Sequence, residues 1–141
     1  MDLKAQLADV DWQQATRRIE GSNTIATLTY HIHYFVAVVR KVLEGGPLDA
    51  HDKFSFDHPP IGSEAEWRSF LDEVWANAEA CAAALEVLPD EKLPEIFFEP
   101  KYGSFHRNIL GIIEHSHYHL GQIVILKKLM NERPYGRSED R

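Results

Sequence analysis

The sequence predicts an all-α protein, a four-helix bundle with long inter-helix loops. Four stretches repeat apolar residues at three- and four-residue spacing, which places them on one face of a helix. Glycine and proline separate these stretches, and no segment shows a convincing strand pattern. A chain of 141 residues can bury a core as one unit. We therefore expect residues 1–141 to form a single domain.

The first two helices differ in how clearly the sequence marks them. The first is predicted to be broken, with one part over residues 3–8 and another over 12–20, ended by Gly21. The second is predicted over residues 24–44, with Ser22 or Asn23 as its N-cap. Gly45-Gly46-Pro47 should end it, because glycine adopts the left-handed cap and proline cannot continue a helix. Its core-facing positions are Ile25, Leu28, Ile32, Phe35, Val36, Val39 and Leu43.

The last two helices are longer and begin at recognisable signals. The third is predicted over residues 63–88, opened by a capping box in which Ser63 and Glu66 satisfy each other's backbone donors. The fourth is predicted over residues 104–131. Gly111 and Gly121 lie inside it, which favours close packing against another helix or subunit.

A long connection, residues 45–62, separates the second helix from the third. It contains Pro47, Pro59 and Pro60, while Phe54 and Phe56 predict that it packs on the body. Loops of this length in compact domains are often functional. Whether this one acts as a lid or only as packing stays open at this stage.

Composition excludes several functional classes. The net charge is -7 and no basic run is present, which argues against nucleic-acid binding or an anionic membrane surface. No apolar stretch is long enough to span a bilayer, and the first residues lack the apolar region of a signal peptide, so we expect a cytoplasmic protein. Cys81 is the only cysteine; it excludes an internal disulfide and is best interpreted as a small buried residue.

The histidines carry the strongest chemical signal. His115 and His119 are four residues apart in a predicted helix, so their imidazoles stand one above the other. His31 occupies the equivalent edge of the second helix. Facing helices of a bundle can bring three such side chains together as a metal site. Three ligands leave positions open for water or substrate, and neutral imidazole suits zinc, nickel, copper and iron alike.

Other polar residues are weaker candidates. Asn108 and Gln122 lie close to the His115–His119 pair on the helical wheel. The remaining histidines are predicted to lie at the surface or a subunit contact (His33, His117) or in or beside loops (His51, His58, His106). No Ser-His-Asp spacing, P-loop or dinucleotide-binding pattern is present. The alternative is that the three central histidines are hydrogen-bonded residues at the edge of the core.

Two segments resemble known motifs. Residues 24–32, TIATLTYHI, resemble the second-helix histidine motif of the DinB/YfiT-like superfamily. Residues 115–123, HSHYHLGQI, resemble its signature of two histidines four apart followed by Gly-Gln. The resemblance extends from the broken first helix to about Met130.

This resemblance implies several properties. They are an up-up-down-down four-helix bundle, commonly a homodimer, and a divalent metal bound by His31, His115 and His119, with zinc or nickel the expected ion. Characterised relatives include transferases and isomerases that use thiols such as bacillithiol or mycothiol.

Two functions follow as hypotheses. The first is a metal-dependent enzyme acting on a small molecule, either a low-molecular-weight-thiol S-transferase or a hydrolase, with no assignable general base. The second is a non-catalytic metal-binding or stress-related dimeric interaction protein. An enzyme needs an accessible pocket beside the metal, whereas a scaffold would bury or fill it.

Overall fold

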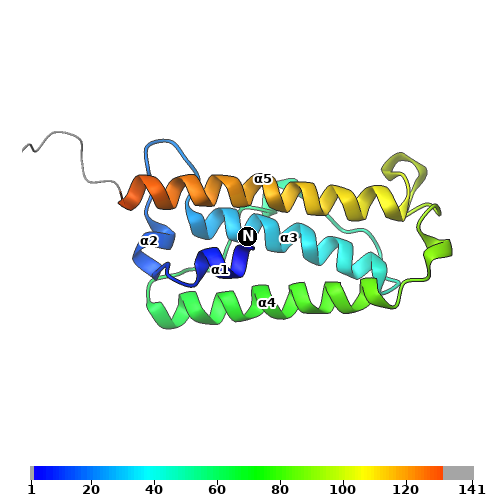
Figure 1. The fold of residues 1–141 in the computed structure, drawn as a ribbon, viewed down its shortest axis with the longest axis horizontal. Helices are drawn as coiled ribbons and strands as arrows, with labels where there is room; N and C mark the ends of the chain where they lie inside the picture. The colour runs from blue at the N-terminus through cyan, green and yellow to red at the C-terminus, as the bar shows by residue number, and fades with distance from the viewer. Residues whose placement is uncertain (1, 132–141) are drawn as a thin grey trace, which may run out of the picture.

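The computed structural model describes residues 2–131. Apart from one isolated β-bridge, every regular element within them is a helix (Figure 1). The five α-helices are α1 (Leu3–Leu7), α2 (Trp12–Thr16), α3 (Ile25–Leu43), α4 (Glu64–Glu86) and α5 (Phe105–Asn131). Short 3₁₀ turns cover Asp52–Phe54, Asp90–Lys92 and Pro100–Tyr102. The predicted all-α class is thereby confirmed.

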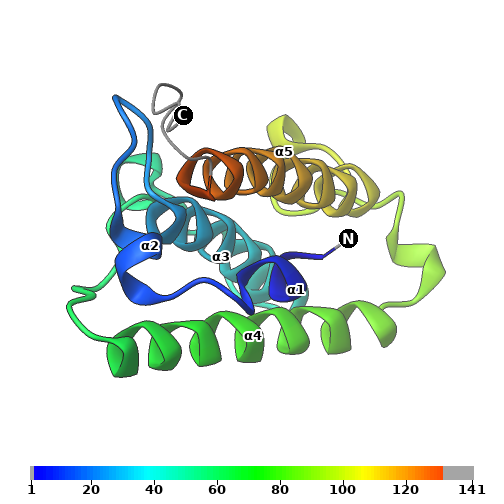
Figure 2. The same ribbon diagram turned by 60° about the vertical axis from the view of Figure 1, so that its left-hand side comes forward.

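Three long helices form the body of the molecule. α3 lies between α4 and α5 and packs against both (Figures 1 and 2). The short helix α1 lies in front of the space between α4 and α5, and α2 lies near one end of α3 (Figure 2). Leu7 and Val10, fully or nearly fully buried, share one core with Phe70 of α4 and Ile123 of α5. The N-terminal segment therefore covers the side that α4 and α5 leave open.

The first helix is broken as predicted, but its second part is shorter. α2 ends at Thr16 because Arg17 takes an extended conformation. Asp11 and Gln14 form a complete capping box at its start, which satisfies two of the free N–H groups there. Residues 17–24 then lead to α3.

The ends of α3 show one wrong and one confirmed prediction. The N-cap is Thr24, whose hydroxyl accepts from the Thr27 N–H; Ser22 instead donates its hydroxyl proton to the Ile19 carbonyl. At the other end Gly45 has φ +89°, and the N–H groups of Gly45 and Gly46 donate to Val42 and Lys41 at 3.0 and 2.7 Å. This is the glycine-dependent cap that the sequence predicts.

Only half of the predicted capping box of α4 forms. The Ser63 hydroxyl accepts from the Glu66 N–H, and the Glu66 carboxylate accepts from that hydroxyl at 3.3 Å rather than from the Ser63 backbone. The neighbouring Glu64 links the N-terminal segment to α4, because its carboxylate accepts from the Trp12 N–H at 2.9 Å and pairs with Arg68 at 2.7 Å.

The helical glycines do not pack against another helix within residues 2–131. A Cβ at Gly111 or Gly121 would meet no protein atom within 4 Å, so the close intrachain packing predicted for them is wrong. Cys81 is buried with Val39, Val42 and Phe97, which confirms its predicted place in the core. No helix of the described residues is both long and apolar enough to cross a membrane.

Candidate metal centre

Three histidines from two helices meet where α3 packs against α5. The ring of His31 lies 4.7 Å from that of His115 and 4.6 Å from that of His119, centroid to centroid. The rings of His115 and His119 are 4.6 Å apart. One potential ligand atom of each residue lies within 4.8 Å of the other two. The predicted convergence of these residues, called here the three-His cluster, is therefore present.

Each helix places its histidines by simple geometry. His115 and His119 are one turn apart on α5, so both rings project from the same edge. His31 lies between buried Leu28 and half-buried Phe35 on α3 and is itself only 5% exposed. The contact between α3 and α5 then brings the three rings to one point.

The ring atoms that face each other suit a metal ion. The Nε2 atoms of His31 and His115 are 3.0 Å apart. Metal–nitrogen bonds of about 2.0–2.1 Å at tetrahedral or right angles put two ligand nitrogens roughly 2.9–3.4 Å apart. Without a cation, this distance fits a hydrogen bond in which one Nε2–H donates to the other ring; with a cation, both nitrogens would instead act as ligands.

A loop residue fixes the orientation of His31. The Nδ1 atom of His31 lies 3.0 Å from the Ser55 hydroxyl oxygen, and that hydroxyl donates its own proton to the Asp52 carbonyl at 2.7 Å. The Ser55 oxygen must therefore accept from Nδ1–H, which leaves the Nε2 lone pair toward the cluster. Ser55 is fully buried. Phe56 stacks on the His31 ring at 4.1 Å and 8°.

On α5 a side-chain oxygen orients His119 in the same way. The Nδ1 atom of His119 lies 2.6 Å from the Gln122 side-chain oxygen, which accepts a proton and so directs Nε2 of His119 away from Gln122. Partners of this kind orient metal-binding imidazoles and raise their basicity. The buried Nδ1 atom of His115 has no hydrogen-bond partner among residues 2–131.

Burial keeps His31 and His115 uncharged. Removal from water, with the nearby His119 and His31, lowers the pKa of His115 to about 4 against an opposing effect of Asp52. Burial also lowers the pKa of His31. Neutral imidazole is the form that binds metals, so His31 and His115 are in their ligand form near neutral pH. No carboxylate of the described residues joins the cluster.

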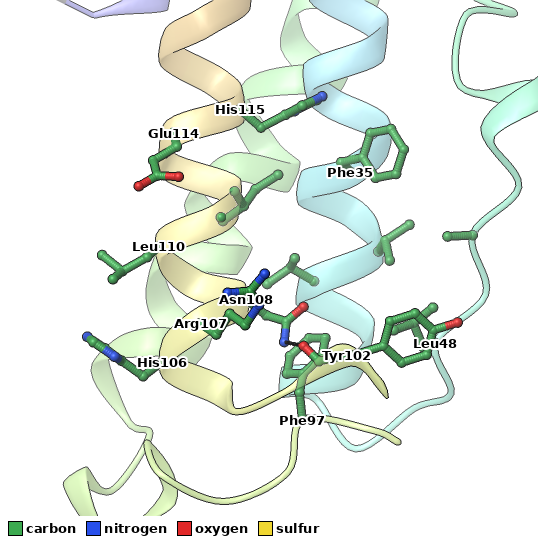
Figure 3. Close-up of a pocket in the computed structure, with 15 residues that line it drawn as sticks. Phe35, Leu48, Phe97, Tyr102, His106, Arg107, Asn108, Leu110, Glu114 and His115 are labelled. Carbon is green, nitrogen blue, oxygen red and sulfur yellow. Dashed lines mark hydrogen bonds between the residues drawn. The ribbon is translucent and has the colours of Figure 1, made fainter. Parts of the chain in front are cut away.

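An open cavity adjoins the cluster. It has a volume of about 680 Å³ and lies over α3 and α5, with His115 and Phe35 at one end and Phe97 and Tyr102 at the other (Figure 3). Walls also come from Leu48 and Ala50 of the 45–62 loop. The cavity gives a small molecule access to the cluster region.

The other polar residues named from the sequence lie at different places around the cluster and on the surface. Gln122 contacts His119, whereas the Asn108 amide donates to the Tyr102 and Ser104 carbonyls at 2.9 Å and lines the cavity. His117 and His51 are exposed. His58 bonds the neighbouring Pro59 carbonyl, and His106 lines the far end of the cavity.

The surface prediction for His33 is wrong. Its ring contacts Phe70, and its Nδ1 and carbonyl oxygen lie 3.2 Å from the Asn77 amide nitrogen of α4. Burial lowers the pKa of His33 as well. A helical wheel shows the direction in which a side chain projects but not which helix it meets. The side chain of His33 meets α4.

Sequence reasoning missed the contacts of Ser55 and Phe56 with His31 and the place of Arg107 on the cavity. Ser55 and Phe56 lie in a loop without periodicity, so no local signal relates them to His31, 24 residues away from Ser55. Arg107 belongs to a helix that was predicted, but its place on the cavity depends on the 97–103 loop and on α3.

Comparison with known proteins gives one match. The family model described as the DinB superfamily matches residues 1–123. No curated protein and no solved structure matches the chain.

Acid should destabilise the metal-free protein through the cluster. An unfolded histidine has a pKa of about 6.5, and folded His115 has a pKa of about 4. Between these values the unfolded chain binds more protons, so the free energy of unfolding falls as pH drops through this range. Urea unfolding with a chelator present, followed by circular dichroism, measures the slope.

His115→Gln should make that slope shallower, and His117→Gln, on the exposed face of the same helix, should leave it unchanged. Equal slopes for wild type and His115→Gln would contradict the assignment of a lowered pKa to His115.

Proposed function

Because the chain belongs to the DinB superfamily and brings three histidines together beside a cavity, we propose that it is a divalent-metal-dependent enzyme. His31, His115 and His119 are the proposed ligands, and zinc or nickel is the proposed ion. The reaction proposed is transfer of a low-molecular-weight thiol to a small molecule, or hydrolysis of one.

The proposed roles of the side chains follow from their contacts. A bound divalent metal supplies a Lewis acid that lowers the pKa of a thiol or water. Ser55 and Gln122 hold the Nδ1 protons of His31 and His119 and keep the Nε2 lone pairs directed inward. Phe56 covers one face of the His31 ring and shields it from water. The cavity holds the substrate with its reacting end toward His115.

One observation favours an enzyme over a scaffold. The cavity beside His115 is open and large enough for a small organic molecule. A non-catalytic metal-binding or stress-related interaction protein would have no need for that space. We keep this second function as the alternative, and turnover discriminates between the two.

We also propose that the fold is a four-helix bundle of the up-up-down-down type, with α1 and α2 together in the place of its first helix. The shared core of Leu7 and Val10 with side chains of α3, α4 and α5 supports this. Residues 1–141 would then form one domain. An experimental structure of the whole chain tests both proposals.

We propose a homodimer formed through the outer face of α5. Tyr118, Ile125 and Leu129 are 67%, 58% and 47% exposed, and they surround Gly121 on one side of the helix. We expect sedimentation velocity to give a dimer for wild type and a monomer for Ile125→Lys. Val87→Lys, at the 79% exposed apolar C-cap of α4, should stay dimeric. A monomeric wild type would refute the proposal.

Metal content tests the proposed site. Protein without a tag, purified without added metal or chelator, should contain about one divalent metal per chain by mass spectrometry. His119→Gln should lose it while circular dichroism shows an unchanged helix content, and His117→Gln should retain it. Wild-type protein that binds neither zinc nor nickel when offered would overturn the proposal.

A substitution at Ser55 distinguishes a residue that only orients a ligand from the ligands themselves, because it should weaken metal binding without abolishing it. Ser55→Ala should keep the metal but weaken its binding roughly 10- to 100-fold, because His31 loses its Nδ1 acceptor. Ser69→Ala, at an exposed position of α4, is the matched control and should bind as tightly as wild type.

Turnover tests the reaction. Metal-loaded protein should accelerate the conjugation of cysteine, bacillithiol or mycothiol to chlorodinitrobenzene, in which the thiol sulfur replaces chloride, or the hydrolysis of an aryl ester. His119→Gln should lose this acceleration. Full activity in that variant would refute a role of the three-His cluster in turnover, and no acceleration by any metal-loaded sample would favour the non-catalytic alternative.

A further inference from the structure

The cavity beside the three-His cluster is not uniform in chemistry. Most of its walls are apolar, and they come from Val38, Val39, Leu48, Phe97 and Ile112. A cation, Arg107, lines the same space. In Figure 3 Arg107 lies centrally over α5, while His106 and Glu114 point toward the outer edge of the helix.

Three residues of α5 form a line along the cavity. Arg107, Gly111 and His115 are spaced four residues apart, so they follow one another along the same flank of the helix. A Cβ at Gly111 would meet no protein atom. Glycine is a poor helix former, and here its missing side chain leaves the floor of the cavity open between the arginine and the histidine.

The local structure holds Arg107 in place. Its backbone N–H donates to the Ser104 hydroxyl at 3.1 Å. Its side chain crosses Gly103, where a Cβ would lie only 2.8 Å from the Arg107 Cδ atom. Gly103 also has φ +78°, a conformation that glycine adopts without strain. Within residues 2–131, no carboxylate forms an ion pair with Arg107.

We propose that this cavity binds a small apolar organic anion, with its carboxylate or sulfonate on Arg107 and its apolar body over Gly111. The other end of the ligand then lies at His115. Eight residues of helix separate the two ends by about 12 Å, which sets the length of the ligand. This proposal names the substrate class of the enzyme proposed above and rests on that function for its reaction.

Two fluorescent probes with nearly the same apolar body test the charge preference. Anilinonaphthalene sulfonate carries an anion, and phenylnaphthylamine does not. We expect wild type to bind both, and Arg107→Gln to weaken binding of the sulfonate roughly tenfold while leaving the neutral probe unchanged. Arg18→Gln, at an exposed arginine away from the cavity, should behave as wild type.

Gly111 supplies the steric test. Gly111→Leu should weaken binding of both probes because its side chain fills the floor of the cavity, whereas Ala83→Leu, at an exposed position of α4, should bind both as wild type does. Gly111→Ala, which favours the helix, keeps the test valid if the leucine variant misfolds: it should weaken both probes less than leucine would.

Unchanged sulfonate binding in Arg107→Gln, or equal loss of both probes, would overturn the proposal. So would unchanged binding of both probes in a folded Gly111→Leu. Metal content measured on the same samples distinguishes failure of the proposed enzyme from failure of the anion site. If the protein binds no metal but still prefers the sulfonate through Arg107, the metal-dependent enzyme is refuted and the anion site is not.

Discussion

The contact between α3 and α5 at His31 is the interaction on which the rest of the site depends. His31 is nearly fully buried, and its Nε2 atom faces that of His115 across the helix interface. Burial lowers the pKa values of both rings, so the same packing that excludes water also keeps the nitrogens able to bind a metal. Position and protonation state thus have one physical cause.

The 45–62 loop belongs to this arrangement rather than to the surface alone. Its Ser55 is fully buried and its Phe56 covers His31, while Tyr34 accepts the His51 N–H at 2.7 Å and holds the loop on α3. Leu48 and Ala50 of the same loop line the cavity. One connection therefore orients a proposed ligand and shapes the space in front of it, which links the stability of the loop to the geometry of the cluster.

The helices and the pairing of His115 with His119 could be predicted from the sequence because both depend on local periodicity, whereas His31 was indicated by its edge position and by the resemblance of residues 24–32 to the superfamily motif. Helical spacing places His115 above His119, and apolar positions such as Ile25 and Leu28 identify the buried edge of α3. Caps were less predictable, since Ser22, Asn23 and Thr24 are all suitable residues; in the structure the Ser22 hydroxyl bonds the Ile19 carbonyl and Thr24 accepts from the Thr27 N–H. Ser55 and His33 could not be placed because their partners come from other segments, and no spacing rule identifies a neighbour across an interface.

The wide separation of the clustered histidines along the chain has a topological consequence. His31 and His115 are 84 residues apart, and α4 with both long connections lies between them. Anything that held these two rings together would act as a reversible crosslink on a large loop, restricting the unfolded chain much as a disulfide does. In a protein whose lone cysteine is buried and free, occupancy of the cluster would couple ligand binding to global unfolding.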